Sequence, residues 1–187
     1  MHTLLAAFGS HGDIFPLLAI GRALRARGGT CQVAAHPLFH REIDGAGLEP
    51  LPLLADVPVA DILRHPDMFH RIRGPLLGGR YLERLSLGAA VDLRRHVAAH
   101  RPDVIVRHYA AISARWVAED AGIPCASTVL APLAWNSAHD PTPAYQVAHG
   151  RGHAIGARLA SRVADPPLQM LFARWARRTR ARAGFDG

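Results

Sequence analysis

A short loop near the amino terminus carries two side chains that could take up a proton. It reads Gly-Ser-His-Gly-Asp from residue 9 to residue 13 and follows the apolar stretch TLLAAF. An imidazole or a carboxylate can abstract a proton from a hydroxyl group within hydrogen-bond reach. His11 and Asp13 are therefore candidate general bases. Each also has a structural interpretation: a main-chain hydrogen bond for His11, and for Asp13 a helix cap, whose loss typically costs about 1 kcal/mol.

The same loop departs from the patterns that bind nucleotides. A dinucleotide loop needs Gly-x-Gly-x-x-Gly and an acidic residue about 20 positions later. Here Gly9 and Gly12 are spaced wrongly, and the next strand ends AAHP without an acid. All 22 basic residues are arginine, which excludes a Schiff-base lysine and a phosphate-loop lysine. No bound NAD is predicted.

Other reactive side chains lack the partners that their chemistry needs. Histidines spaced four apart could lie on one helical face, as metal ligands do. Three such pairs occur, none with a third ligand nearby: His36 and His40, His96 and His100, and His149 and His153. No serine stands in a Gly-x-Ser-x-Gly elbow. The sequence predicts neither a metal site nor an acyl-transfer nucleophile.

The elements that must position the loop alternate between strand and helix. Short apolar runs predict strands and helical spacing of apolar residues predicts helices. The strands are expected over 3–8, 30–36, 48–53, 102–107 and 123–130, and the helices over 16–27, 37–47, 80–100 and 111–121, with two more between 146 and 187. Pro16 suits a first helical position. The order predicts an α/β fold, a Rossmann-like parallel sheet flanked by helices, whose strands end at one ligand-binding edge.

The composition is that of a globular domain. The chain has 187 residues, of which 49% are hydrophobic, enough for a sizeable core. No stretch approaches the roughly 18 to 20 apolar residues of a membrane span, and the amino terminus does not resemble a leader. A cytoplasmic protein is predicted. Cys31 and Cys125 stand in apolar strand segments, so both are expected to be buried free thiols.

The formal net charge is +7, and much of the positive charge lies near the carboxyl terminus, in RWARRTRARAG from residue 174 to residue 184. A basic patch of this kind can meet nucleic acid or an anionic membrane surface. No aromatic residues interleave with arginines on the strands, so nucleic acid is not a predicted partner. Peripheral membrane contact through this arginine-rich helix remains one interpretation, and a helix with solvated arginines is the other.

The loop and its surroundings resemble a known family. The stretch GSHGDIFPLLAIGRALRARGG, followed by GAGLEPLPL, is similar to the amino-terminal half of glycosyltransferases of the two-domain GT-B fold. The similar branches act on antibiotic aglycones, sterols and lipids, and include the group called family 28. RPDVIV and VAEDAGIPCASTVLAP match later elements of that half. The resemblance covers most of residues 1–143.

This resemblance implies an inverting transfer, in which an acceptor hydroxyl loses its proton and attacks the anomeric carbon of a nucleotide-activated sugar. In the antibiotic and sterol branches the loop aspartate, matching Asp13, is the proposed base. In the plant and macrolide branches it is the histidine two residues earlier, matching His11. The plant branch orients that histidine with an aspartate after a later strand, where this chain has His108. We predict that His11 and Asp13 both stand at the reacting hydroxyl, and leave open which is the base.

The acceptor implied by the resemblance is a hydrophobic small molecule or a lipid. The loops after Leu53 and Leu130 are expected to line its site. The residues predicted to bind it are Ser10, Gly12, Phe15, His108, Trp135, Asn136 and His139. For the loop that holds the last three, a packed surface loop is the alternative interpretation.

The resemblance also implies that residues 1–187 form one domain, the acceptor-binding half, apparently truncated. The family holds its UDP- or dTDP-sugar with a His-x-Gly-rich segment, and none occurs before Gly187. The chain is therefore expected to bind no cofactor itself, and to turn over only with a donor half, for example as a separate subunit. The alternative is a non-catalytic Rossmann-like binding or partner module.

Overall fold

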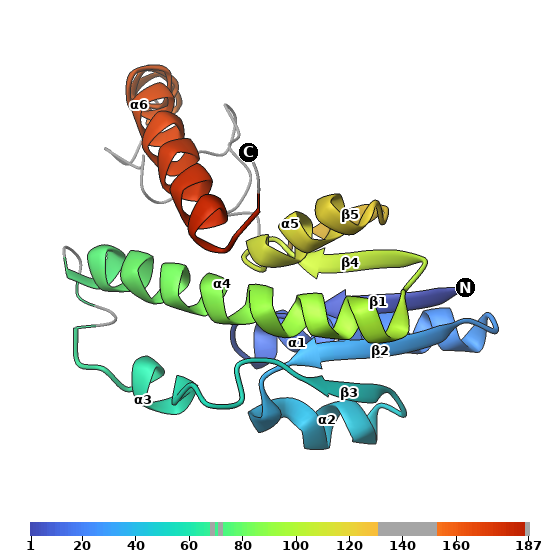
Figure 1. Cartoon of the computed structure of the whole chain (residues 1–187). Coiled ribbons are helices and arrows are strands. Elements are labelled where there is room, and N and C mark those ends of the chain that lie inside the picture. The colour runs from blue at the N-terminus through green and yellow to red at the C-terminus, as the bar shows by residue number, and fades with distance from the viewer. Residues whose placement is uncertain (68–69, 71–72, 131–152, 186–187) are drawn as a thin grey trace. The chain divides into compact units, whose positions relative to one another are not determined.

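Five parallel strands form one sheet in the computed structural model, in the order β3-β2-β1-β4-β5 (Figure 1). The strands are β1 (His2–Ala6), β2 (Thr30–Ala35), β3 (Glu49–Pro52), β4 (Val104–His108) and β5 (Cys125–Thr128). The structure describes residues 1–67, 70, 73–130 and 153–185. Every neighbouring strand pair is parallel, which confirms the predicted Rossmann-like sheet.

Helices connect the strands and follow the last one. They are α1 (His11–Ala26), the 3₁₀ turn η1 (Pro37–Phe39), α2 (His40–Gly45), α3 (Val59–Leu63), α4 (Arg73–His100), α5 (Ile112–Ala121) and α6 (His153–Arg182). Within the described ranges, every helix is too short or too polar to cross a lipid bilayer. The chain divides into two compact units, one of residues 1–128 with 179–187 and one of residues 129–178.

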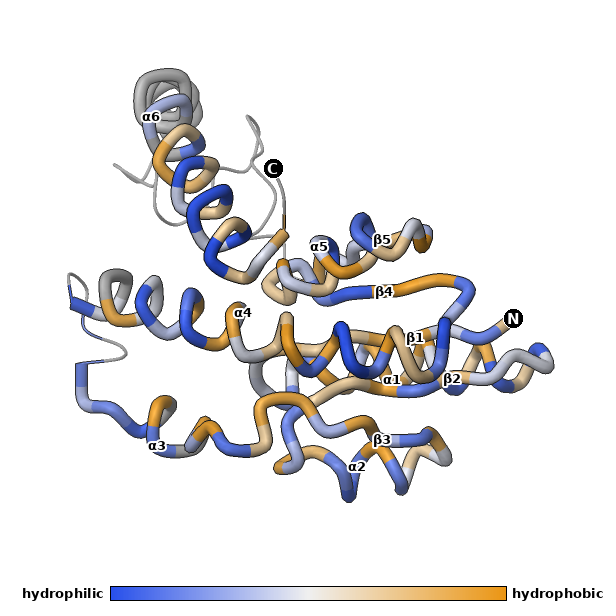
Figure 2. Tube along the Cα trace, in the orientation of Figure 1, coloured by the Kyte–Doolittle hydropathy of each residue, from blue (hydrophilic) through white to orange (hydrophobic). Residues whose placement is uncertain are grey.

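The central strand β1 is buried on both faces of the sheet. Leu4 and Ala6 join a core cluster that includes side chains of α4 and α5, whereas Leu5 and Ala7 join a second cluster with α1 and α2. Successive side chains of a strand point to opposite faces, so a continuous apolar run fits a sheet covered on both sides. In Figure 2, hydrophobic and hydrophilic residues alternate around α4, as expected for a helix with one buried face.

The first helix begins at His11, five residues earlier than the prediction of Pro16. Ser10 is its N-cap, and the Ser10 N–H donates to the Asp13 carboxylate at 2.7 Å. This satisfies a main-chain donor that a helix start would otherwise leave free. Pro16 lies inside the helix and has no N–H to offer the Gly12 carbonyl. The prediction failed because local capping outweighed the preference of proline for the first helical position.

Two further boundaries differ from the sequence-based expectation. Helix α4 begins at Arg73 rather than Arg80. Pro75 falls in its first turn, where a missing N–H costs little because that N–H has no helical partner. In place of the two helices expected near the carboxyl terminus, α6 is one helix that continues across Pro166 and Pro167.

Arg94 of α4 contacts residues 183–185, which follow α6, and holds them against the core. Its guanidinium donates to the carbonyl oxygens of Ala183 at 3.0 Å and Gly184 at 2.7 Å. It also lies 3.6 Å from the ring centroid of Phe185, a buried side chain that packs near Trp116. Arg94 therefore binds residues 183–185 through both charged hydrogen bonds and a cation–π contact.

We expect Arg94→Ala to lower the free energy of unfolding by about 2 kcal/mol, because both kinds of contact are lost. Urea denaturation followed by circular dichroism measures it. Arg95 is a matched control: its side chain is 71% exposed and pairs with Asp92 on the same helix. Arg95→Ala should change the free energy of unfolding by less than about 0.5 kcal/mol. Equal losses in the two variants would contradict this account.

The two cysteines differ in exposure. Cys31 is buried and burial raises its pKa to about 11. Cys125 is exposed, contrary to the prediction, because its strand β5 is largely exposed, although partial burial raises its pKa as well. A buried thiol that stays protonated reacts slowly. At pH 8 we expect the disulfide reagent DTNB to modify one thiol in the native chain and two in denaturant, and Cys125→Ser to abolish native labelling. Native labelling of both would contradict this.

Candidate active site

The carboxyl ends of the parallel strands meet at one edge of the sheet, where ligands of such sheets bind. From the end of β1 the chain passes through Gly9, whose φ of +124° turns it into α1. His11 and Asp13 are thereby placed as the first and third residues of α1. His108 is the last residue of β4, the strand beside β1. The edge therefore brings the amino-terminal loop and the end of β4 together.

The Asp13 carboxylate is held at the start of α1 by two groups of Ser10 and faces a buried imidazole. Asp13 Oδ2 accepts hydrogen bonds from Ser10 N at 2.7 Å and Ser10 Oγ at 3.1 Å. Asp13 Oδ1 lies 3.3 Å from His108 Nε2. The Asp13 side chain is 30% exposed, so it remains open to a ligand. The amino end of a helix also favours a negative charge.

His11 faces a different carboxylate. Its Nε2 lies 3.3 Å from Oε1 of Glu42 on α2, and its side chain is 58% exposed. The imidazole packs against the rings of Phe15 and Phe39, at centroid distances of 5.4 and 5.1 Å. The pKa of Glu42 is lowered, first by a main-chain hydrogen bond and further by His11. The resemblance left open which carboxylate could orient His11. The structure places the Glu42 carboxylate of α2 beside it.

These side chains form two histidine–carboxylate pairs, which we name the Asp13–His108 pair and the His11–Glu42 pair. Residues two apart on a helix do not face each other. His11 and Asp13 therefore point in different directions and take different partners. The two candidate bases do not contact the same partner, and each forms a separate site.

An apolar cavity of about 110 Å³ lies at the same edge of the sheet. It is lined by Ala7, Phe8, Gly9, His36, Phe39, Leu53, Leu54, Val59, Ile62 and Leu85. His36 is the one polar lining side chain, and both of its ring nitrogens are engaged, with the Val57 oxygen and the Leu38 N–H. None of the four paired side chains lines the cavity, but Phe39, which does, packs against the His11 ring, and Gly9 belongs to the loop that leads into α1. A cavity below the roughly 150 Å³ that holds benzene accommodates only a small apolar group.

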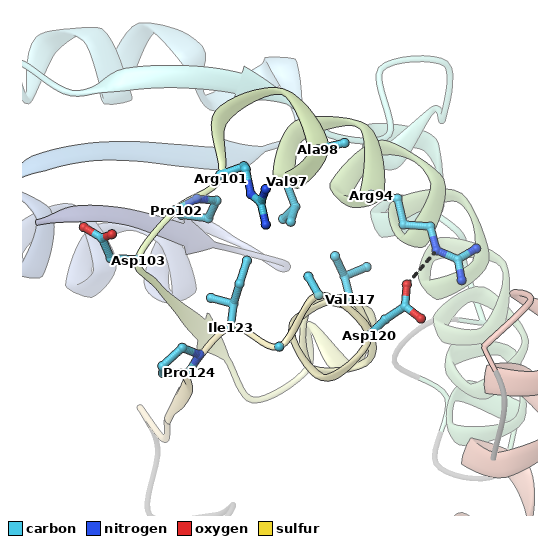
Figure 3. A pocket seen from close by; sticks show the side chains of 12 residues that line it. Arg94, Val97, Ala98, Arg101, Pro102, Asp103, Val117, Asp120, Ile123 and Pro124 are labelled. Carbon is cyan, nitrogen blue, oxygen red and sulfur yellow. Dashed lines mark ion pairs between the residues drawn. The ribbon is translucent and has the colours of Figure 1, made fainter.

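A larger cavity, of about 640 Å³, lies at the opposite edge of the sheet (Figure 3). It opens between α4 and α5, beside the segments that lead into β4 and β5, and is lined in part by Arg101, Asp103 and Ile123. Arg94 and Asp120 form an ion pair in its wall at 3.7 Å. Neither histidine–carboxylate pair borders this cavity, and the edge is not the one where parallel sheets bind ligands. We therefore place the candidate active site at the carboxyl edge.

Most of the residues predicted to form the site fall at the carboxyl edge. Ser10, Asp13 and His108 come together, and Phe15 lies beside His11. Gly12 is in the first turn of α1. The remaining predicted residues, Trp135, Asn136 and His139, lie outside the described residues, as does the loop after Leu130. In the described part of the chain, no three potential metal ligands come together.

Two residues of the site were missed from the sequence, Glu42 and Phe39. Both follow β2, and nothing in their spacing from the first loop marks them. The signal that could have found them is the strand order, since β2 lies next to β1. Connections after neighbouring parallel strands emerge at the same edge, so α2 is brought beside the start of α1.

No protein-family model matches the chain. Among curated proteins it is similar to an L-demethylnoviosyl transferase of Streptomyces niveus, with 28% identity over 126 residues, 66% of this chain and 33% of the relative. A solved glycosyltransferase, SnogD of Streptomyces nogalater, superposes with a TM-score of 0.64 at 20% identity, over 100% of this chain and 42% of its own. A glycosyltransferase of Streptomyces sp. SF2575, solved with thymidine diphosphate, gives 0.59 at 23% identity, over 88% and 45%.

The chain has the fold of these solved glycosyltransferases. This confirms the fold that the resemblance implied. The chain spans about a third of the curated relative and less than half of each of these solved proteins.

Proposed function

We propose that this chain is the acceptor-binding half of an inverting glycosyltransferase. It would transfer a sugar from a nucleotide-activated donor to a hydroxyl group of a hydrophobic natural product, a sterol or a lipid. The observation that carries the proposal is the position of the Asp13 carboxylate, partly exposed at the start of α1, at the sheet edge where the apolar cavity also lies. The fold shared with natural-product glycosyltransferases supports it.

In this proposal the acceptor places an apolar group in the cavity and its hydroxyl at Asp13. The hydroxyl proton passes to Asp13 while the acceptor oxygen attacks the anomeric carbon from the side opposite the nucleotide. The bond between that carbon and the phosphate oxygen breaks, and its electron pair leaves with the nucleoside diphosphate. The configuration at the anomeric carbon is therefore inverted. A positioned general base contributes typically about 10²- to 10⁴-fold to such a rate.

His11 is the second candidate base, and a specific observation favours it. The Glu42 carboxylate lies beside Nε2 of His11 and can orient the imidazole, as a carboxylate does for a catalytic histidine. The ring also packs on Phe39, which lines the cavity. If His11 is the base, the acceptor hydroxyl lies on the other side of the first turn of α1.

The donor belongs, in this proposal, to a second half, either in the same polypeptide or in a separate subunit. A UDP- or dTDP-sugar is the expected donor, and the similar protein solved with thymidine diphosphate supports the second. A cytoplasmic enzyme with peripheral membrane contact through α6 fits a lipid acceptor. Exposed Met170, Leu171 and Phe172 stand near the arginines of that helix, a combination that favours anionic membrane surfaces.

The test combines the purified chain with a donor half encoded at the same locus or taken from a close relative. UDP- and dTDP-sugars are offered with phenolic polyketide, sterol and lipid acceptors, and products are identified by mass spectrometry. We expect a glycosylated acceptor only when both halves are present. Acceptor binding without product, for every donor half and donor, would overturn the catalytic proposal and leave a non-catalytic binding module.

A further inference from the structure

His108 is a buried polar side chain with an incomplete set of partners. It is 2% exposed, and its ring nitrogens have only the main chain of Phe8 and the Asp13 carboxylate near them among the described residues, neither in a well-aligned hydrogen bond. Buried polar groups in native proteins are nearly always hydrogen-bonded. The polar side chain that Nε2 does face, at 3.3 Å, is the Asp13 carboxylate. A buried imidazole that faces the candidate base needs a functional explanation.

The surroundings of His108 act on its charge in opposite directions. Burial lowers the pKa of the imidazole, and the neighbouring Arg107 lowers it further. The Asp13 carboxylate and the main chain of Phe8 raise the pKa, and the Tyr109 ring packs at a centroid distance of 4.4 Å. Burial is the largest of these effects, so the imidazole is neutral near pH 7. It can therefore receive a proton in the presence of the carboxylate.

The two carboxylate oxygens of Asp13 have different partners. Oδ2 already accepts two hydrogen bonds from Ser10, which fill its favourable positions. Oδ1 faces His108 and retains a lone pair for another proton. The oxygen with capacity to accept a proton from an acceptor is therefore the oxygen that lies against the imidazole.

We propose that His108 is the positioning residue for Asp13, in a histidine–carboxylate pair in which the carboxylate meets the substrate and the buried histidine stands behind it. This rests on the proposed function. The acceptor O–H bond breaks and its proton passes to Asp13 Oδ1. It then moves to His108 Nε2, which is free to accept it when the neutral imidazole carries its own proton on Nδ1. The result is an imidazolium beside a restored carboxylate, so no proton is lost or gained. The imidazole thus gives the abstracted proton a second position, farther from the acceptor oxygen.

The first test measures the pair in the 187-residue chain, without any donor half. The pKa of His108 is followed by NMR of the imidazole in the native protein and in Asp13→Asn. Because Asp13 raises the pKa of His108, removal of its charge should lower that pKa further. Asp44→Asn, which changes an exposed carboxylate on α2, should leave it unchanged. A His108 pKa that is the same in the native protein and in Asp13→Asn would overturn the pairing.

The second test measures catalysis by the assembled enzyme. We expect His108→Phe to lower kcat by about 10-fold or more with little change in the acceptor KM. His108→Gln, which keeps a polar group toward Asp13, should recover part of the loss. Wild-type kcat in His108→Phe, alongside an inactive Asp13→Asn, would overturn the role of His108 and leave the proposed function standing. Full activity of Asp13→Asn would instead remove the proposed base.

Discussion

Asp13→Asn is expected to reduce the kcat of the assembled enzyme by about 10²- to 10⁴-fold. The amide has the shape of the carboxylate and its oxygen can still accept hydrogen bonds from Ser10. It cannot take up the acceptor proton, so the loss falls on the chemical step. The acceptor KM should change little, because the apolar lining of the cavity is intact. Steady-state kinetics over a range of acceptor concentrations measures both constants.

Two comparisons make this result specific. Asp44→Asn removes an exposed carboxylate from α2 and should keep the wild-type kcat, which separates general loss of charge from loss of the base. His11→Ala tests the other pair. If Asp13→Asn keeps full activity while His11→Ala is inactive, the His11–Glu42 pair holds the base and Asp13 is a helix cap alone.

Gly9→Ala should impair both folding and catalysis. The backbone at Gly9 has φ of +124°, which side chains rarely adopt. A Cβ atom there would lie 2.1 Å from Asp13 Oδ2 and 3.1 Å from Asp13 Cβ. Rotation of the carboxylate relieves the first contact but not the second. We expect a loss of about 1–3 kcal/mol in the free energy of unfolding and about 10²-fold in kcat, because the carboxylate is displaced.

Thermal unfolding and steady-state kinetics measure the two effects of this substitution. Gly45→Ala is the matched control, since a Cβ at Gly45 in α2 meets nothing within 4 Å. That variant should unfold at the wild-type temperature or slightly above it, because alanine favours a helix, and its kcat should be unchanged. If Gly9→Ala behaves like Gly45→Ala, the loop does not constrain Asp13 as the structure indicates.

The parallel sheet was predictable because its signals are local. Apolar runs at 3–8, 30–36 and 102–107 alternate with helical spacing, and all three are strands of the sheet. The start of α1 was also encoded locally, in the Ser10-x-x-Asp13 spacing of a helix cap. The preference of Pro16 for a first helical position led instead to the expectation that the helix begins at residue 16. Two local signals competed there, and the hydrogen bond between Ser10 and Asp13 outweighed the proline.

The sequence by itself determined the elements and the two groups that could take a proton, His11 and Asp13. The spacing of apolar residues, helix caps and turns involve only a few neighbouring residues, so they can be recognised without a structure. The tertiary structure alone decided the partners, Glu42 for His11 and His108 for Asp13. Those contacts join residues that are 31 and 95 positions apart in the chain. They depend on the strand order β2-β1-β4, which places three chain segments at one edge and which no local spacing specifies.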